Sequence, residues 1–215
     1  EMCIRDSTYS VYAEATITHD INVGSSGTQT TYIDAPSTDI YLGGMFTIQD
    51  VVKSRDVTSL TIAASGTIDV MNSVDNIRLY YDLDTTAPYD CASESYVGGE
   101  SQYGVTDTDG FDGSGLSTFT DTQGIATSAA MCLYVIADIT TDANNAETLE
   151  IYMDDPSSDV GVSVGDVRPT TTVAISGSST IRDDVLTQIH YHWRNDDGDQ
   201  AGATSATGGT QDTVL

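Results

Sequence analysis

Positive charge is scarce in this chain. Its 215 residues include 7 Lys and Arg against 33 Asp and Glu, which gives a formal net charge of −26. So few cations cannot form the basic patch that nucleic acid binding requires. The same charge disfavours binding to an anionic membrane surface. The sequence therefore excludes nucleic acid and anionic lipid from the expected partners.

Long apolar runs and helix-forming residues are also lacking. No stretch approaches the roughly 20 apolar residues of a membrane-spanning helix, so no membrane insertion is expected. Of the 33 acids, 27 are Asp and only 6 are Glu, and Lys53 is the single lysine. Because Glu and Lys favour helices while Thr, Tyr and Val favour strands, the composition predicts an all-β protein.

Sequence signatures of catalysis are missing as well. There is no Gly-x-Ser-x-Gly turn around a nucleophilic serine and no Gly-x-x-x-x-Gly-Lys phosphate-binding loop. A pair of carboxylates can always be chosen from 33 acids, so such pairs do not indicate a glycosidase. We therefore expect no enzymatic activity in this chain.

Short segments with alternating apolar and polar residues are what the chain does contain. In one of them Ile77, Leu79, Tyr81 and Leu83 share a face, as in a sheet with one side in water. Two such sheets bury their apolar faces together, which predicts an antiparallel β-sandwich of immunoglobulin-like or jelly-roll type. The expected strands are Ser10–Thr18, Thr30–Ala35, Met45–Gln49, Val57–Ala64, Thr67–Val70, Asn76–Leu83, Ala130–Thr140, Thr148–Met153, Val160–Val164, Thr172–Ile175 and Val185–Trp193.

Three parts are expected along the chain. Residues 1–7 read like the translation of a sequencing adapter and are set apart from the fold. Residues 8–176 are expected to form the sandwich, with a long structureless insertion at Asp84–Gln123 that is rich in Gly, Ser, Asp and Tyr. Residues 177–215, with a tight turn at Asp197-Gly198, are expected to be an incomplete second β module.

The cysteines predict one disulfide. Cys3 lies in the adapter-like segment, which leaves Cys91 at the start of the insertion and Cys132 in a strong strand. A bond between them would pin the insertion to the sandwich and stabilise the fold by roughly 3–4 kcal/mol through loop closure. Such a bond is typical of an extracellular protein. Two unrelated buried thiols are the alternative.

Acidic loops suggest calcium as the one candidate cofactor. Asp107, Asp109 and Asp112 surround Gly110, and alternating Asp side chains at a bend can supply the oxygens that calcium needs. The spacing does not match an EF-hand, and a solvated Asp-rich turn is the alternative. Other candidate ligands are Asp82, Asp84 and Asp90, and a second loop formed by Asn195, Asp196, Asp197 and Asp199.

Histidine and tyrosine provide the remaining candidates. His190 and His192 would share one face of a strand, but no third zinc ligand accompanies them, which favours two surface imidazoles. Tyr89, Tyr96 and Tyr103 lie in the insertion, where exposed rings could contact a sugar or a protein. Half-buried packing is the alternative for these tyrosines.

Two stretches resemble known modules. Asn76–Asp90, followed by Cys91 and Cys132, resembles a β-rich module of large, uncharacterised secreted proteins of bacteria. His192–Gly198, with its Trp-Arg-Asn-Asp-Asp-Gly core, resembles a short recurring module in multidomain cell-surface proteins of environmental bacteria. The resemblance implies secretion and a modular architecture. It carries no known activity and therefore no functional residues.

The sequence thus favours a non-catalytic structural or adhesive module of a secreted cell-surface protein. Its partner would be a protein or a glycan outside the cell. One alternative is a carbohydrate-binding module of a larger secreted enzyme. Another is a self-assembling filament subunit, with Ser10–Thr18 as a strand donated to an open sheet edge.

Overall fold

The structure is a computed structural model that describes residues 21–50 and 52–183. These residues form fourteen strands and two four-residue helices, α1 (Val70–Ser73) and α2 (Pro156–Asp159), which confirms the all-β prediction. No helix in this part of the chain is long and apolar enough to cross a membrane. Several predictions lie outside the described residues, namely the segment 1–7, the strands at 10–18 and 185–193, His190 and His192, and the acidic loop 195–199.

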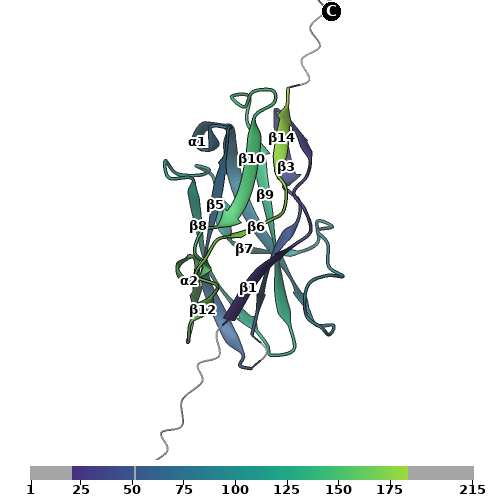
Figure 1. Ribbon diagram of the computed structural model, residues 1–215, viewed down its shortest axis with the longest axis vertical. Helices are drawn as coiled ribbons and strands as arrows, with labels where there is room; N and C mark the ends of the chain where they lie inside the picture. The colour runs from purple at the N-terminus through teal and green to yellow at the C-terminus, as the bar shows by residue number, and fades with distance from the viewer. Residues whose placement is uncertain (1–20, 51, 184–215) are drawn as a thin grey trace, which may run out of the picture. The chain divides into compact units, whose positions relative to one another are not determined.

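Two sheets build a sandwich (Figure 1). The first has the order β12-β1-β4-β9-β6-β7, and β3 also pairs with β9. Its strands are β1 (Ile21–Ser26), β3 (Ser37–Tyr41), β4 (Met45–Gln49), β6 (Val74–Asp84), β7 (Ser101–Asp107), β9 (Ala130–Ile139) and β12 (Val167–Arg168).

The second sheet has the order β11-β5-β10-β14-β2, with β8 on β5 and β13 on β10. Its strands are β2 (Tyr32–Asp34), β5 (Arg55–Gly66), β8 (Leu116–Ile125), β10 (Thr148–Met153), β11 (Val160–Val162), β13 (Val173–Ala174) and β14 (Ser179–Arg182). Both sheets are mixed rather than purely antiparallel, because β1 pairs with β12 and β2 with β14 in parallel. The early and late strands of the chain thus lie side by side.

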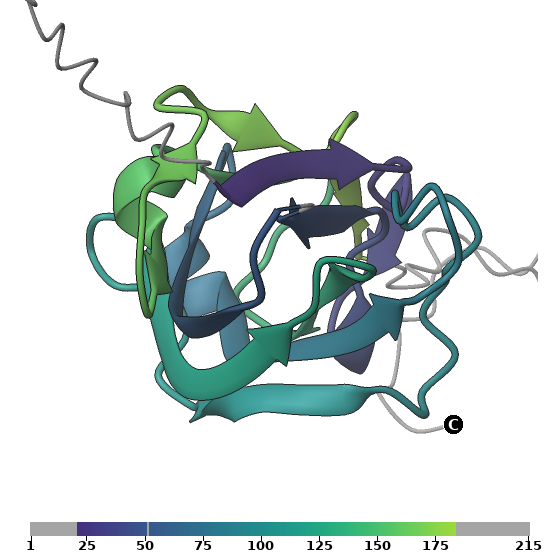
Figure 2. The same ribbon diagram turned by 90° about the horizontal axis from the view of Figure 1, so that it is seen from below.

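The core lies between the sheets, and the strands surround it in a view along their length (Figure 2). In the first sheet Leu79 lies opposite Val135, and in the second Leu60 lies opposite Phe119. β9 is buried along almost its whole length, so both of its faces are covered. That is why it reads as one continuous apolar run instead of an alternating strand.

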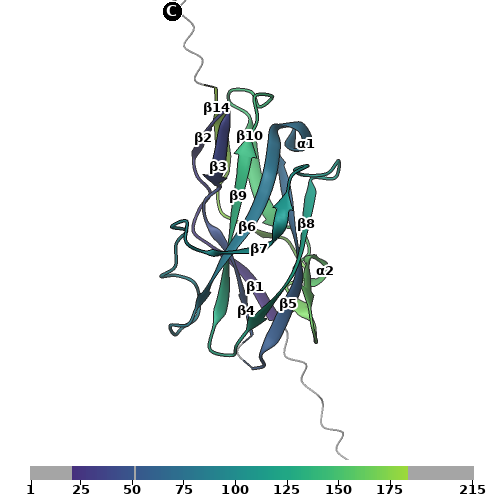
Figure 3. The same cartoon turned by 180° about the vertical axis from the view of Figure 1, so that it is seen from behind.

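The predicted structureless insertion at 84–123 is wrong for about two fifths of its length. It contains all of β7 and most of β8, which lie beside each other where the two sheets meet (Figure 3). Gly104 N donates to the Asp121 carboxylate at this junction, at 3.0 Å. Both strands carry many polar side chains on their solvent side, so the sequence resembles a loop. The irregular segment is confined to 85–100 and a turn at 108–115.

Two further expectations change. The segment 67–70 is no strand but a bend that leads into α1. β14 pairs with β10 and β2, so the sandwich continues past the boundary expected at 176. The chain separates into compact units at Asp183, and the second unit, 184–215, lies outside the described residues.

Candidate functional site

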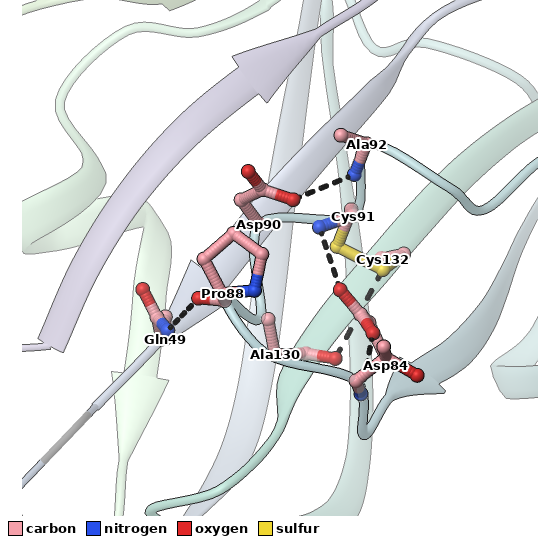
Figure 4. Close-up of a disulfide and its surroundings, with 9 residues drawn as sticks. Gln49, Asp84, Pro88, Asp90, Cys91, Ala92, Ala130 and Cys132 are labelled. Carbon is pink, nitrogen blue, oxygen red and sulfur yellow. Dashed lines mark hydrogen bonds between the residues drawn. A yellow bond between two sulfur atoms is a disulfide. The ribbon is translucent and has the colours of Figure 1, made fainter.

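Residues 85–100 form the most prominent loop of the sandwich, which we call the tyrosine loop. It connects β6 to β7 and projects from the side of the fold (Figures 1 and 3). The predicted disulfide between Cys91 and Cys132 is confirmed, with 5.7 Å between the two Cα atoms. Figure 4 shows how it ties the loop to β9. The bond fixes the loop on the outer face of the first sheet.

Aspartates hold the beginning of the loop. One Asp84 oxygen accepts the Thr86 N–H at 2.9 Å, and the other accepts the Cys91 N–H at 3.0 Å (Figure 4). Asp90 accepts the N–H of Ala92 at 3.0 Å. Short Asp side chains commonly close turns in this way. Asp84 is buried and both of its oxygens are occupied, so it acts as a structural residue of the loop.

A cluster of tyrosines lies beneath the loop. The rings of Tyr41, Tyr80, Tyr96 and Tyr134 form a chain of neighbours with centroid distances of 5.1–5.8 Å. Tyr134 is fully buried, whereas the other three rings are partly exposed. Together with the disulfide and β9 side chains they form a small second core, against which Tyr89 also packs. Tyr89 and Tyr96 therefore combine packing with partial exposure.

The far end of the loop forms a rigid crest. The Glu100 carboxylate accepts the N–H groups of Val97 and Gly98, at 2.5 and 2.8 Å. Burial opposes the ionisation of Glu100, but hydrogen bonds from the backbone N–H groups of residues 97–100 outweigh it, and the pKa is lowered. This arrangement leaves the Val97 side chain 81% exposed. An apolar side chain is thus held in water by a fixed backbone.

Negative charge accumulates around the cluster. Residues 82–100 include five acids and no Lys or Arg. The pKa of Asp82 is raised, first by burial and then by the charge of Glu100. Burial and then the same glutamate raise the pKa of Tyr41 to about 12. The pKa of Tyr134 is raised well above its usual range by burial and by Asp82. The site therefore stabilises positive charge and penalises further negative charge.

The charge at position 82 leads to a testable stability effect. Because the folded-state pKa of Asp82 is raised, the fold loses stability as the pH rises from the ordinary pKa of 3.8 to the folded-state pKa, and this loss persists unchanged at higher pH. We expect Asp82→Asn to raise the melting temperature by a few degrees near pH 7 and to have no effect below the ordinary pKa of 3.8. Thermal unfolding at both pH values tests this, with Asp34→Asn on the exposed β2 as control. A stabilisation that does not vary with pH would contradict it.

Tyr103 was wrongly predicted as a contact residue. It lies opposite Leu79 on the inner face of β7 and is fully buried in the core. Its hydroxyl is 3.3 Å from both the Val57 and Asp121 carbonyl oxygens, to which it can donate. The prediction was wrong because residues 101–107 were expected to be a loop. In a strand, by contrast, alternate side chains point into the core, and Tyr103 is one of them. Tyr103 is therefore a core residue.

Two of the three predicted calcium ligands, Asp107 and Asp112, accept hydrogen bonds in the turn between β7 and β8, and the third, Asp109, takes part through its backbone N–H. Asp107 accepts the Asp109 N–H and the Ser117 hydroxyl. Asp112 accepts the N–H groups of Ser114 and Leu116, at 2.7 and 3.0 Å. Within residues 21–50 and 52–183, no three His, Cys, Asp or Glu side chains are grouped so that they could hold a metal ion. Calcium binding stays a prediction.

Sequence reasoning missed three members of the cluster: Tyr41, Tyr80 and Tyr134. A signal for two of them was present. Tyr80 alternates with the inward-facing Leu79 and Tyr81, which places it on the outer face. Tyr134 lies two residues after Cys132, so it shares the face on which the disulfide holds the loop. The exposure of Val97 had no sequence signal.

A second feature is a pocket of about 550 Å³ at the end of the sandwich that carries α2 and β12. Serine, threonine, valine and glycine line it, with Asp166 and Arg168 as its charged residues. Among the residues that the structure describes, no aromatic side chain lines this pocket. It therefore offers no ring on which a sugar could stack.

Comparison with known proteins adds no assignment. No family model matches the chain, and no curated protein matches it. Within the described residues both cysteines are joined in the disulfide, and the three histidines lie elsewhere in the chain.

Proposed function

We propose that this chain is a non-catalytic contact module of a secreted cell-surface protein and that the tyrosine loop is its contact surface. The observation that carries the proposal is the crest, where Val97 is 81% exposed on a backbone held by Glu100 and the disulfide. A surface fixed before binding loses little conformational entropy when a partner docks. Tyrosines beside an apolar anchor are typical of such surfaces. The disulfide supports an extracellular location.

The alternatives receive less support. A glycan-binding surface cannot include Tyr103, because this residue is buried in the core. Such a surface would depend on Tyr96 and the adjacent ring of Tyr41. A filament built by strand exchange needs a long open edge. The edge strands β2, β11, β12 and β13 contain only two or three residues each, and the longer edge strands β7 and β8 lie beside each other where the sheets meet. Short edge strands give a donated strand few hydrogen bonds. Two copies of a chain with a net charge of −26 also repel each other.

The contact surface can be tested with two valines of equal exposure. Val97 lies on the crest and Val105 on β7, and each is 81% exposed. We screen the full chain by biolayer interferometry against arrays of purified extracellular proteins and glycans. Val97→Ser is expected to weaken the strongest interaction about tenfold, as for an anchor residue, whereas Val105→Ser leaves it unchanged. Equal affinities for both variants and the parent chain would exclude the tyrosine loop as the contact surface.

A further inference from the structure

The outer face around the tyrosine loop is short of hydrogen-bond donors. Asp82 and Glu94 are both partly buried, yet neither carboxylate accepts a hydrogen bond from any of the described residues. By contrast, Asp84 and Glu100 each receive two backbone N–H groups. A partly buried carboxylate without a donor is an unfavourable arrangement that a donor from a partner can relieve.

A buried hydroxyl of the same face also lacks a hydrogen-bond partner in the described part of the chain, although a phenol can both donate and accept. Tyr134 is fully buried, and its hydroxyl has no hydrogen-bond partner among the described residues. It belongs to the same outer face, because Tyr134 pairs with Tyr80 and the next outward pair is Asp82 with Cys132. Most buried hydroxyls in folded proteins are bonded. The face thus combines an orphan hydroxyl with two carboxylates that lack donors.

Within residues 21–50 and 52–183, no basic side chain of this face donates to Asp82 or Glu94. The nearest basic residue along β6 is Arg78, which forms ion pairs with Asp39 and Asp138. A metal ion is not favoured either, since the described residues lack a group of three suitable ligands. The occupant must therefore bring both positive charge and N–H donors, and it must tolerate aromatic neighbours.

We propose that the partner of the tyrosine loop is a lysine-rich protein segment whose ammonium groups bind the Asp82 and Glu94 carboxylates beside the rings of Tyr80 and Tyr96. This inference rests on the proposed contact function. An ammonium group brings three donors and a full charge, and tyrosine faces attract such cations. Val97 would pack against the aliphatic stem of a neighbouring lysine. A second copy of the chain lacks this chemistry, because it contains one lysine and a net charge of −26.

The test uses a fluorescent peptide of alternating lysine and glycine, with the same peptide acetylated on every lysine as its neutral counterpart. Binding of the full chain is measured by fluorescence anisotropy at about 50 mM salt, where charge interactions are weakly screened. The site variant is Asp82→Asn with Glu94→Gln. The matched control is Asp34→Asn with Glu150→Gln, which removes the same charge from exposed positions of the second sheet.

The expected result is about tenfold weaker peptide binding by the site variant and less than a twofold change for the control. Tyr96→Leu removes the ring but leaves an apolar side chain at this position, and it is expected to weaken binding about threefold through the lost cation–π contact. The acetylated peptide is expected not to bind. Equal losses in both double variants would show a non-specific attraction to a polyanion and would overturn the proposal, as would tight binding of the acetylated peptide.

The outcomes also separate this proposal from the contact function itself. If Val97→Ser abolishes binding to an array partner but the lysine peptide does not bind the parent chain, the contact surface stands and the lysine assignment fails. The lysine assignment would also fail, and the contact surface would stand, if the array partner whose binding is lost in Val97→Ser were an uncharged glycan. Melting curves of all variants verify the fold; Asp82→Asn removes a strained charge and is not expected to destabilise it.

Discussion

Arg55→Met is expected to lower the free energy of unfolding by about 3–5 kcal/mol, since it breaks a buried ion pair and leaves one charge unpaired. The side chains of Arg55 and Asp50 are only 3% and 2% exposed. Asp50 receives Arg55 Nε and the N–H groups of Val52 and Lys53, while Arg55 also donates to the Val164 carbonyl. Urea unfolding of the full chain measures the loss.

Arg182→Met provides the matched control. Arg182 lies over the ring of the exposed Tyr32, at 3.4 Å from its centroid, so its removal is expected to cost about 1 kcal/mol or less. If both variants lowered the free energy of unfolding by a similar amount, the larger effect expected from burial of the Asp50–Arg55 pair would be contradicted. Gly165→Ala disturbs the Asp50–Arg55 pair in a second way, because a Cβ at this position would lie 1.6 Å from Arg55 Nη1 and would displace the guanidinium group.

The Asp50–Arg55 pair also has a defined pH dependence. Burial alone would raise the pKa of Asp50, but the N–H groups of Val52 and Lys53 and then Arg55 outweigh it, and the pKa is lowered. A carboxyl with a lowered folded-state pKa contributes stability above its ordinary pKa of 3.8, and this contribution is lost as the pH falls through the folded value. The difference between the parent and Arg55→Met is therefore expected to shrink in acid.

Removing the disulfide is expected to have the second largest effect. Cys91 and Cys132 are separated by 41 positions in the sequence, and loop-closure entropy gives such a cross-link roughly 3–4 kcal/mol of stabilisation. We expect the double variant Cys91→Ala, Cys132→Ala to lose about this amount in urea unfolding. The tyrosine loop should also become the first site of limited proteolysis, because its attachment to β9 is gone.

The control for this experiment addresses the third cysteine. Cys3→Ser is introduced into both the parent and the double variant, so that no free thiol can exchange with the disulfide. A reducing agent should reproduce the effect in the Cys3→Ser parent and leave the double variant unchanged. If unfolding and proteolysis are the same with and without the disulfide, the turn hydrogen bonds of Asp84 alone hold the loop.

Much of the fold was predictable because its signals are local. Alternation along Asn76–Leu83 and the apolar run at 130–140 indicated β6 and β9, and β4 was found with its observed bounds. The disulfide followed from having only two cysteines beyond the first residues. The charge of −26 is a property of the composition alone, and the partners that it disfavours stay a prediction. Each of these properties belongs to single segments or to the whole composition.

The sequence by itself thus determined the all-β class, the cross-link and the acidic character, whereas only the tertiary structure decided which tyrosines lie in the core and which lie on the outer face. Tyr103 and Tyr80 both lie on alternating strands, yet one is buried in the core and the other lies under the tyrosine loop. Alternation defines two faces but does not say what covers each of them. That depends on segments far apart in the chain: the loop tied to β9 by Cys91, and β12 returning beside β1. The physical reason is that burial is a property of the assembled sandwich and not of any one strand.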